Sequence, residues 1–265
     1  MGNFSFKQLK HKALETIQNE PALTNLITSL VLKPADFKEA LGALLTNQCL
    51  FLHEGMNLLL EIQKALEEDP SIAKNAASDL EAIVEKDPAA CDYLEPFLFY
   101  KGFHSLELYR IGHHLWNRGK PYLAYYIQSR VSLLYGVDIH PAALIGKGVF
   151  IDHATAIVIG ETAIVEDNVS LLHQVTLGGT GKKTGKRHPT IRRDSLLGAG
   201  ATILGDIEIG EGSVVGAGSV VLHSVAPHSV AVGVPAETKG TIKIRSPANK
   251  MDQIFDSRLY RTNTD

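Results

Sequence analysis

The sequence predicts an α+β fold, in which an all-helical N-terminal domain precedes a parallel β-helix. Two observations lead to this prediction. In the first half of the chain, apolar residues recur at spacings of three and four, which is typical of helices that bury one face. In the second half, aliphatic residues recur every six positions, a period that fits neither a helix nor a simple two-faced strand.

Residues 1–136 are the predicted helical domain. Glycines are sparse there, and prolines punctuate the apolar pattern. Asp69-Pro70 and Asp87-Pro88 each place an acidic residue before a proline, a pairing typical of the start of a helix. The segments 103–115 and 122–134 are apolar and aromatic enough to be buried against neighbours. We expect this burial within the domain or against other subunits.

Residues 137–240 are the predicted β-helix. Six residues form one side of a triangular coil, one aliphatic side chain per side points inward, and successive coils stack about 4.8 Å apart. The residues expected to point inward are Ile139, Ile145, Ile151, Ile157, Ala163, Val169, Val175, Ile191, Leu197, Ile203, Ile209, Val215 and Val221. Glycines that follow several of them supply the backbone freedom that tight corners need. Residues 241–265 form a polar tail without hexads.

A single insertion interrupts the repeat. The spacing between Val175 and Ile191 does not fit the six-residue frame, so the segment LGGTGKKTGKRHPT must leave the coil as a loop over residues 178–190. Insertions in solenoid proteins often lie on the binding face. This loop is therefore a candidate functional element, although a purely solvated lysine-rich loop is the structural alternative.

Composition narrows the possible classes of function. The 265 residues carry a formal net charge of -3 and include 45% hydrophobic residues, so no basic field for nucleic acid is expected. No apolar run is long enough for a membrane span, and the N-terminus lacks the apolar core of a signal peptide. The sequence therefore predicts a cytoplasmic protein. Cys49 and Cys91 lack metal-site spacing and are expected to be buried, reduced thiols.

Histidines cluster around the first coils, at His140, His153, His173 and His188. Because a coil closes about every 18 residues, Asp138 and His153 are expected to lie roughly one coil apart, near a corner. A carboxylate that holds one nitrogen of an imidazole leaves the other free to take a proton from a hydroxyl. The pair is a candidate catalytic dyad. A structural contact at the corner is the alternative interpretation.

Four further residues suit a small amino acid. Arg187 and His188 can bind a carboxylate, whereas Asp152 and Asp87 can hold an ammonium group. For Asp87, a role as helix cap is the competing interpretation, because Asp69 occupies the same local setting.

Three segments carry a family resemblance. The runs DPAACDYLEPFLFYKGFHSLELYRIGHHLWNRGK, VDIHPAALIGKGVFIDHATAIVIGET and VTLGGTGKKTGKRHPTI resemble bacterial serine O-acetyltransferase, a hexapeptide-repeat acyltransferase. The resemblance spans roughly residues 87–240. It implies a left-handed β-helix, against the usual right-handed crossover, and trimers through the β-helices that pair into a hexamer.

The resemblance also implies roles for individual residues. The catalytic base falls on His153, its carboxylate partner on Asp138, and the serine-binding residues on Asp87, Asp152, Arg187 and His188. His173 stands where some members have an amide, and we expect it to pack behind the site. Acetyl-CoA is the implied co-substrate, with no metal expected. It would lie between neighbouring β-helices, against the backbone near Gly179, Ala199 and Ala217.

The implied reaction is acetyl transfer from acetyl-CoA to L-serine, which gives O-acetyl-L-serine in the first step of cysteine biosynthesis, with feedback inhibition by L-cysteine. The alternatives are another small hydroxyl acceptor, a zinc-dependent β-helix carbonic anhydrase, or a catalytically silent scaffold. Many family members dock into O-acetylserine sulfhydrylase through a terminal isoleucine. This chain ends at Asp265, so weak or absent docking is expected.

Overall fold

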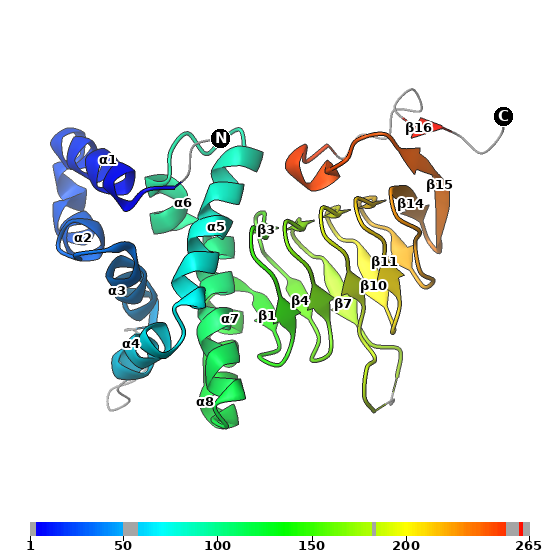
Figure 1. The fold of residues 1–265 in the computed structure, drawn as a ribbon, viewed down its shortest axis with the longest axis horizontal. Helices are drawn as coiled ribbons and strands as arrows, with labels where there is room; N and C mark the ends of the chain where they lie inside the picture. The colour runs from blue at the N-terminus through cyan, green and yellow to red at the C-terminus, as the bar shows by residue number, and fades with distance from the viewer. Residues whose placement is uncertain (1–3, 50–57, 182–183, 253–259, 262–265) are drawn as a thin grey trace.

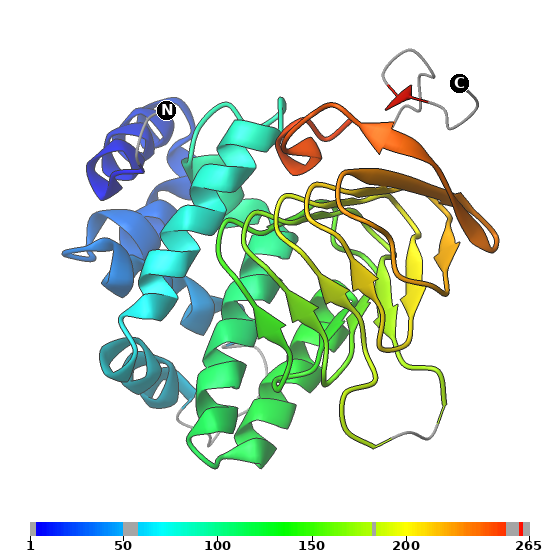
Figure 2. The ribbon, with the colours of Figure 1, turned by 45° about the vertical axis from the view of Figure 1, so that its right-hand side comes forward.

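A computed structural model describes residues 4–49, 58–181, 184–252 and 260–261, and shows a helical region followed by a parallel β-helix (Figure 1). The helices gather at the N-terminal end of the solenoid, and the last coils lie at the far end (Figures 1 and 2). The predicted fold class is confirmed. Within the described ranges, no helix is long and apolar enough to cross a membrane.

The helical region contains eight α-helices in the described part of the chain. They are α1 (Phe6–Asn19), α2 (Thr24–Ile27), α3 (Phe37–Cys49), α4 (Leu58–Glu68), α5 (Ser71–Lys86), α6 (Leu94–Phe99), α7 (Lys101–Asn117) and α8 (Pro121–Tyr135). A 3-10 turn (Pro21–Leu23) and a π-helical turn (Thr28–Leu32) flank α2. Ser5 starts α1 with a capping box that includes Gln8.

Of the two helix starts predicted from Asp-Pro pairs, one is confirmed and one is wrong. Helix α5 begins at Ser71, whose backbone N–H donates to Asp69 Oδ1 at 2.9 Å. Asp87 instead terminates α5 and accepts a hydrogen bond from the backbone N–H of Ala89 at 2.9 Å. The same side-chain chemistry that caps a helix also closes a turn. The next helix begins only at Leu94.

Three faces make up the β-helix. Face A contains β1 (Val137–Ile139), β4 (Ile157–Ile159), β7 (Thr176–Gly178), β10 (Thr202–Leu204) and β13 (Val220–Val221). Face B contains β2 (Leu144–Ile145), β5 (Ile164–Val165), β8 (Thr190–Ile191) and β11 (Glu208–Ile209). Face C contains β3 (Phe150–Ile151), β6 (Ser170–Leu171), β9 (Leu196–Leu197), β12 (Val214–Val215), β14 (Ser229–Gly233), β15 (Ala236–Ile242) and β16 (Tyr260–Arg261), of which the last three pair antiparallel.

The predicted inward residues are buried, except Ile145, which is half-buried. The coil length is less regular than the hexads suggest. Thr202 pairs with Val220, an 18-residue coil, but Asp138 pairs with Val158, a 20-residue coil. The first coil is longer because its corner at residues 152–156 contains extra residues. Asp138 therefore lies beside Val158 on face A.

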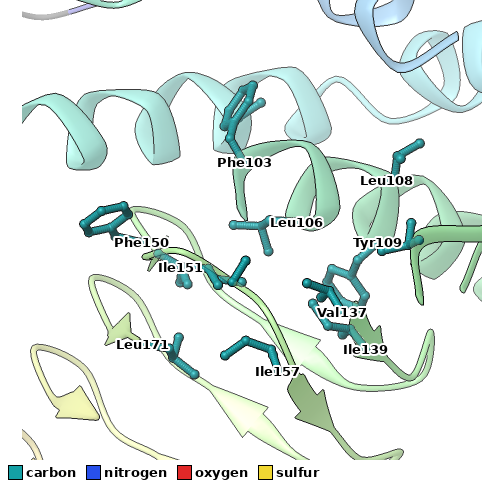
Figure 3. Close-up of a cluster of buried hydrophobic side chains, with 14 of the residues drawn as sticks. Phe103, Leu106, Leu108, Tyr109, Val137, Ile139, Phe150, Ile151, Ile157 and Leu171 are labelled. Carbon is teal, nitrogen blue, oxygen red and sulfur yellow. The ribbon is translucent and has the colours of Figure 1, made fainter. Parts of the chain in front are cut away.

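Helix α7 joins the helical region to the first coil. Leu106 points towards Ile151 on face C, whereas the Phe103 ring points into the helical region (Figure 3), where its centroid lies 6.2 Å from that of Phe97. The first turn of α7 approaches the coil so closely that a Cβ on Gly102 would lie 2.0 Å from the carbonyl oxygen of Ile151. Only glycine fits this contact, so backbone meets backbone at the junction.

Buried charges reinforce the junction. The Arg110 guanidinium of α7 binds Asp79 of α5 and donates to the carbonyl oxygen of Gly146 at 2.7 Å. Asp79 also accepts from the backbone N–H of Val149 at 2.8 Å. Glu107 is fully buried beside them, and among the described residues neither of its carboxyl oxygens has a hydrogen-bond partner. Burial raises the pKa of Glu107 well above its ordinary value, against the attraction of the Arg110 guanidinium, whose Nε lies 3.4 Å from Glu107 Oε2; the balance favours the neutral carboxyl group.

The tail covers face C. Ile244 and Met251 pack against a small apolar cluster of Leu172, Leu196, Val214, Val230 and Ile242. Asn168 donates to the side-chain oxygens of Asn249 at 2.9 Å and Ser246 at 3.3 Å, which fastens the tail to the second coil.

The expectation of a buried thiol is wrong for Cys91, which is exposed in the turn between α5 and α6. Its apolar sequence neighbours form a turn rather than the predicted helix. The side chain of Cys49 lies outside the described residues.

Candidate active site

The predicted site residues lie at two opposite edges of face A. The histidine edge is the corner at residues 152–156, between β3 and β4, with the equivalent corners of later coils stacked on it. The loop edge comprises residues 160–162 and the excursion between β7 and β8, described at residues 179–181 and 184–189, which projects from the coil (Figure 2).

The histidine edge has an unusual backbone. His153, Ala154 and Ala156 have φ angles of 56°, 56° and 62°, a left-handed conformation that is unfavourable for residues with a Cβ. Hydrogen bonds hold the corner, from Ala156 N to the Gly136 carbonyl at 2.7 Å and from Gln174 N to the Thr155 carbonyl at 2.8 Å. Strained corners of this kind are concentrated at functional sites.

The corner presents the imidazole of His153 to solvent, since its side chain is 75% exposed. Its Nε2 lies 3.8 Å from Asp152 Oδ1, and its ring centroid lies 5.8 Å from that of His173. Burial raises the pKa of Asp152, the positive charge of His153 opposes this increase, and the charge of Asp87 adds to it. The structure thus brings Asp87, Asp152 and His153 together.

Asp87 reaches this edge from the end of α5. Tyr100 donates its hydroxyl hydrogen to Asp87 Oδ2 at 3.1 Å. Burial and the hydrogen bond to Asp87 raise the pKa of the Tyr100 phenol, so it stays a donor at neutral pH. No motif in the sequence distinguishes Tyr100 as a site residue.

At the loop edge, Thr162 holds His188. The backbone N–H of Thr162 donates to His188 Nδ1 at 3.2 Å, and the Thr162 hydroxyl lies 2.9 Å from the same nitrogen. Nδ1 is therefore an acceptor, and in the neutral ring Nε2 carries the hydrogen. Burial and then the charge of Arg187 lower the pKa of His188, which favours the neutral form.

Two neighbours of Thr162 complete this cradle. The Glu161 carboxylate forms an ion pair with the Arg187 guanidinium. The imidazole of His188 lies against Gly160, where a Cβ would come within 2.1 Å of the ring. Residues 160–162 were part of the quoted family motif but had no assigned role. The coil that contains the excursion is 26 residues long, as the pairing of Thr176 with Thr202 shows. Glu161 and Arg187 are also 26 residues apart, so the length of this coil would have predicted their contact.

Asp138 lies on face A, apart from His153. Its Oδ1 accepts a hydrogen bond from Gln128 Nε2 at 2.6 Å. Among the described residues, His153 does not hydrogen-bond to Asp138. The charge of Asp138 instead acts near the loop edge, because the charges of Asp138 and Arg187 both affect the pKa of His140. Burial lowers that pKa, and the His140 ring packs against Trp116 and Tyr125.

The residues predicted to contact acetyl-CoA are divided in the same way. Ala199 and Ala217 stack above His173 on the histidine edge, where Gly200 N donates to the His173 carbonyl and Gly218 N donates to the Ala199 carbonyl. Gly179 lies on the loop edge, where a Cβ would be 3.5 Å from His188 Nε2.

No group of three or more His, Cys, Asp or Glu residues converges as metal ligands would, within the part of the chain that the structure describes. A groove of about 560 Å³ lies on face B, lined by residues that include His113, Ile164 and Arg193. It contains none of the predicted site residues.

Comparisons with known proteins agree with these observations. Residues 6–108 match the family described as "Serine acetyltransferase, N-terminal", and residues 188–223 match "Bacterial transferase hexapeptide (six repeats)". The serine acetyltransferase of Salmonella typhimurium is 46% identical over 255 residues, which cover 95% of this chain and 92% of the relative.

Solved structures show the same fold. A serine acetyltransferase in complex with cysteine superposes with a TM-score of 0.91 at 43% identity, covering 95% of this chain and 98% of the other. The serine acetyltransferase of Brucella abortus strain S19 in complex with coenzyme A gives a TM-score of 0.86 at 41% identity, covering 89% of this chain and 95% of the other.

Proposed function

The chain belongs to the serine acetyltransferase family, and from this premise we propose how its residues transfer the acetyl group of acetyl-CoA to the hydroxyl of L-serine. The products are O-acetyl-L-serine and CoA. The observation that carries the assignment of residues is the exposed imidazole of His153 beside the carboxylates of Asp152 and Asp87.

His153 is the general base. Its free imidazole nitrogen takes the proton of the serine hydroxyl as that oxygen attacks the thioester carbon. The carbon–sulfur bond then breaks, and the imidazolium returns the proton to the departing CoA sulfur. No acyl-enzyme is required, because both substrates can be held in one cleft. Asp138 orients the imidazole and stabilises its protonated form.

The acceptor is recognised through both ends of the amino acid. Asp87 and Asp152 bind the serine ammonium group, and Arg187 and His188 bind its carboxylate. The neutral imidazole of His188 offers Nε2–H as a donor, while Thr162 occupies Nδ1. L-cysteine inhibits the enzyme, and because it differs from L-serine only in the side-chain heteroatom, we expect it to compete for the same groups.

The complete site forms between protomers. Even the three residues of β4, which separate the two edges, span about 10 Å. Three β-helices would pack around a three-fold axis with face A of each towards that axis. The histidine edge of one protomer would then lie against the loop edge of the next. Asp138 and the loop would then reach His153 from the adjacent protomer. Acetyl-CoA would lie in this groove, against Gly179, Ala199 and Ala217.

Inter-protomer complementation tests this arrangement. His153→Ala and Arg187→Ala remove residues from opposite edges, so each homotrimer should be nearly inactive with serine. Unfolding and refolding a mixture of the two would give mixed trimers in which some interfaces carry both native edges. Recovery of part of the wild-type activity is expected. Absence of recovery in trimers shown to be mixed would contradict a shared site.

The helical regions would join two such trimers into a hexamer in the cytoplasm. Residues 262–265, on which the expectation about docking to O-acetylserine sulfhydrylase depends, lie outside the described part of the chain. The acceptor is tested by measuring release of free thiol from acetyl-CoA with serine, homoserine, sugars and aminoglycosides. Release with serine and not with the other acceptors is expected.

A further inference from the structure

The break between α6 and α7 lies where the helical region meets the histidine edge. Tyr100 separates the two helices, with φ of -80° and ψ of 108°, which is an extended conformation between helical neighbours. The side chains of Tyr100 and Lys101 consequently reach different targets. Tyr100 contacts Asp87 at the end of α5, and Lys101 contacts the β-helix corner at residues 152–156.

Tyr100 fixes the orientation of Asp87. Its hydroxyl donates to Asp87 Oδ2 at 3.1 Å, while the backbone N–H of Ala89 donates to Oδ1 at 2.9 Å. Each carboxylate oxygen therefore has a donor from the protein, and the remaining lone pairs have a defined direction. The charge of Asp152 also affects the Tyr100 phenol, so the tyrosine lies near both carboxylates of the proposed ammonium site.

Lys101 fixes the corner that carries His153. Its ammonium group donates to the Thr155 hydroxyl, and that hydroxyl donates to the backbone carbonyl of His153 at 3.3 Å. The corner has three left-handed residues with side chains, a conformation that persists only where the surroundings enforce it. The lysine supplies such a restraint from outside the coil.

Gly102 makes both contacts possible. Because its Cα lies against the Ile151 carbonyl, the first turn of α7 is seated directly on the strand that leads into the corner. A side chain at this position would push the turn outward, and Tyr100 and Lys101 with it.

We propose that Tyr100 and Lys101 are positioning residues that hold Asp87 of the helical region in register with His153 of the β-helix. This inference rests on the proposed function, in which Asp87 binds the serine ammonium group and His153 takes the hydroxyl proton. Neither Tyr100 nor Lys101 contacts serine. Tyr100 acts on acceptor binding through Asp87, and Lys101 acts on turnover through the His153 corner.

Tyr100→Phe tests the first connection. Loss of a hydrogen bond to a charged group corresponds to a rise of about tenfold to a hundredfold in the KM for serine, with the KM for acetyl-CoA unchanged. Tyr109→Phe is the matched control, because it also removes a hydroxyl that donates a hydrogen bond, here to the Ala143 carbonyl away from the site. Its KM for serine should match that of the wild type. An equal rise for both substrates, or no change for serine, would overturn the proposal.

Lys101→Met tests the second connection. A looser corner should lower kcat several-fold, at unchanged KM for serine, because general-base catalysis depends on the placement of the base. Lys120→Met is the control, since it removes a lysine that pairs with Glu61 in the helical region. An unchanged kcat for Lys101→Met would show that the turn does not couple the two parts. If the wild type itself released no thiol with serine, the proposed function would fail instead.

Discussion

The backbone N–H of Thr162 donates to His188 Nδ1 at 3.2 Å, which fixes the tautomer of a histidine 26 residues later in the chain. The Thr162 hydroxyl also accepts from the backbone N–H groups of Arg187 and His188, at 3.0 and 3.1 Å. A single threonine thus anchors the end of the excursion and leaves Nε2, which lies beside Gly160 and Gly179, as the nitrogen that carries the hydrogen.

Substitution of Thr162 by valine should weaken acceptor binding. The change removes the hydroxyl but keeps the shape, so the Arg187 and His188 N–H groups lose their acceptor. We expect the KM for serine to rise about threefold to tenfold, the range for one or two neutral hydrogen bonds, with melting temperature nearly unchanged. Thr16→Val, which removes a hydroxyl bonded within α1, is the control in the same steady-state assay. A serine KM like that of the control would rule out the anchoring role of Thr162.

Gly160→Ala should displace His188. The new Cβ would meet the imidazole at 2.1 Å, and overpacking of this kind costs about 1–3 kcal/mol. Gly112→Ala, in helix α7, is the matched glycine control, because its Cβ would be 3.8 Å from its nearest neighbour, the Ala124 carbonyl oxygen. Serine turnover should fall only in Gly160→Ala, while Gly112→Ala should be neutral or slightly stabilising. Full activity of Gly160→Ala would mean that the position of His188 is unimportant.

Stability should decrease as the pH falls from 7 to 5, in part through His104. Burial lowers the pKa of His104 from 6.5 to about 4, and its Nε2 lies 2.8 Å from the Phe97 carbonyl oxygen. Because the unfolded chain takes up a proton before the folded one does, the neutral fold loses stability as the pH falls through this window. The expected loss is about 2 kcal/mol.

Urea denaturation at several pH values isolates this effect. His104→Gln keeps a donor for the Phe97 carbonyl but cannot titrate, so its stability should vary less between pH 7 and 5 than that of the wild type. Identical pH profiles for the two proteins would show that His104 is already protonated in the fold.

Substitutions in the buried cluster of Asp79, Glu107 and Arg110 at the junction should have unequal effects on the free energy of unfolding. Arg110→Met leaves Asp79 without its cation and should destabilise the protein by about 3–5 kcal/mol. Glu107→Gln keeps a neutral, isosteric group and should be at least as stable as the wild type at pH 7. The raised pKa keeps a proton on Glu107 in the folded wild type, whereas the unfolded chain loses that proton above about pH 4.5. The wild type therefore gains stability as the pH falls towards 4.5, and the difference in stability between Glu107→Gln and the wild type should diminish.

Chemical denaturation of the two variants at pH 4.5 and 7 provides the measurement. A strong destabilisation by Glu107→Gln at pH 7 would contradict a neutral Glu107. In that case the carboxylate itself would be needed by Arg110.

Much of the fold follows from local pattern. Aliphatic hexads identify the coil because each side of a triangle has one repeat, and the excursion breaks that frame visibly. The hexad pattern does not specify how many residues a corner contains. It therefore did not predict the longer first coil, in which Asp138 lies beside Val158. It also mistook Asp87 for a helix start, because a carboxylate before proline suits both a cap and a turn.

The sequence selects the candidate site residues by their chemical type, but it does not predict how they are arranged. Charge and hydrogen-bonding chemistry, together with the family motif, selected His153 and Arg187. Their separation onto two edges of face A depends on which corner each occupies, which the hexad frame alone does not specify. Thr162 and Tyr100 were missed because their roles come from contacts between distant segments.

The most direct test of the account is thiol release from acetyl-CoA in the presence of L-serine, compared between the wild type and His153→Ala. We expect His153→Ala to fold and bind acetyl-CoA normally but to lose about 10²–10⁴ in turnover, the range for a positioned general base. Asp138→Asn should lose less. Near-normal turnover by His153→Ala would show that another group, with His173 the nearest imidazole, removes the hydroxyl proton.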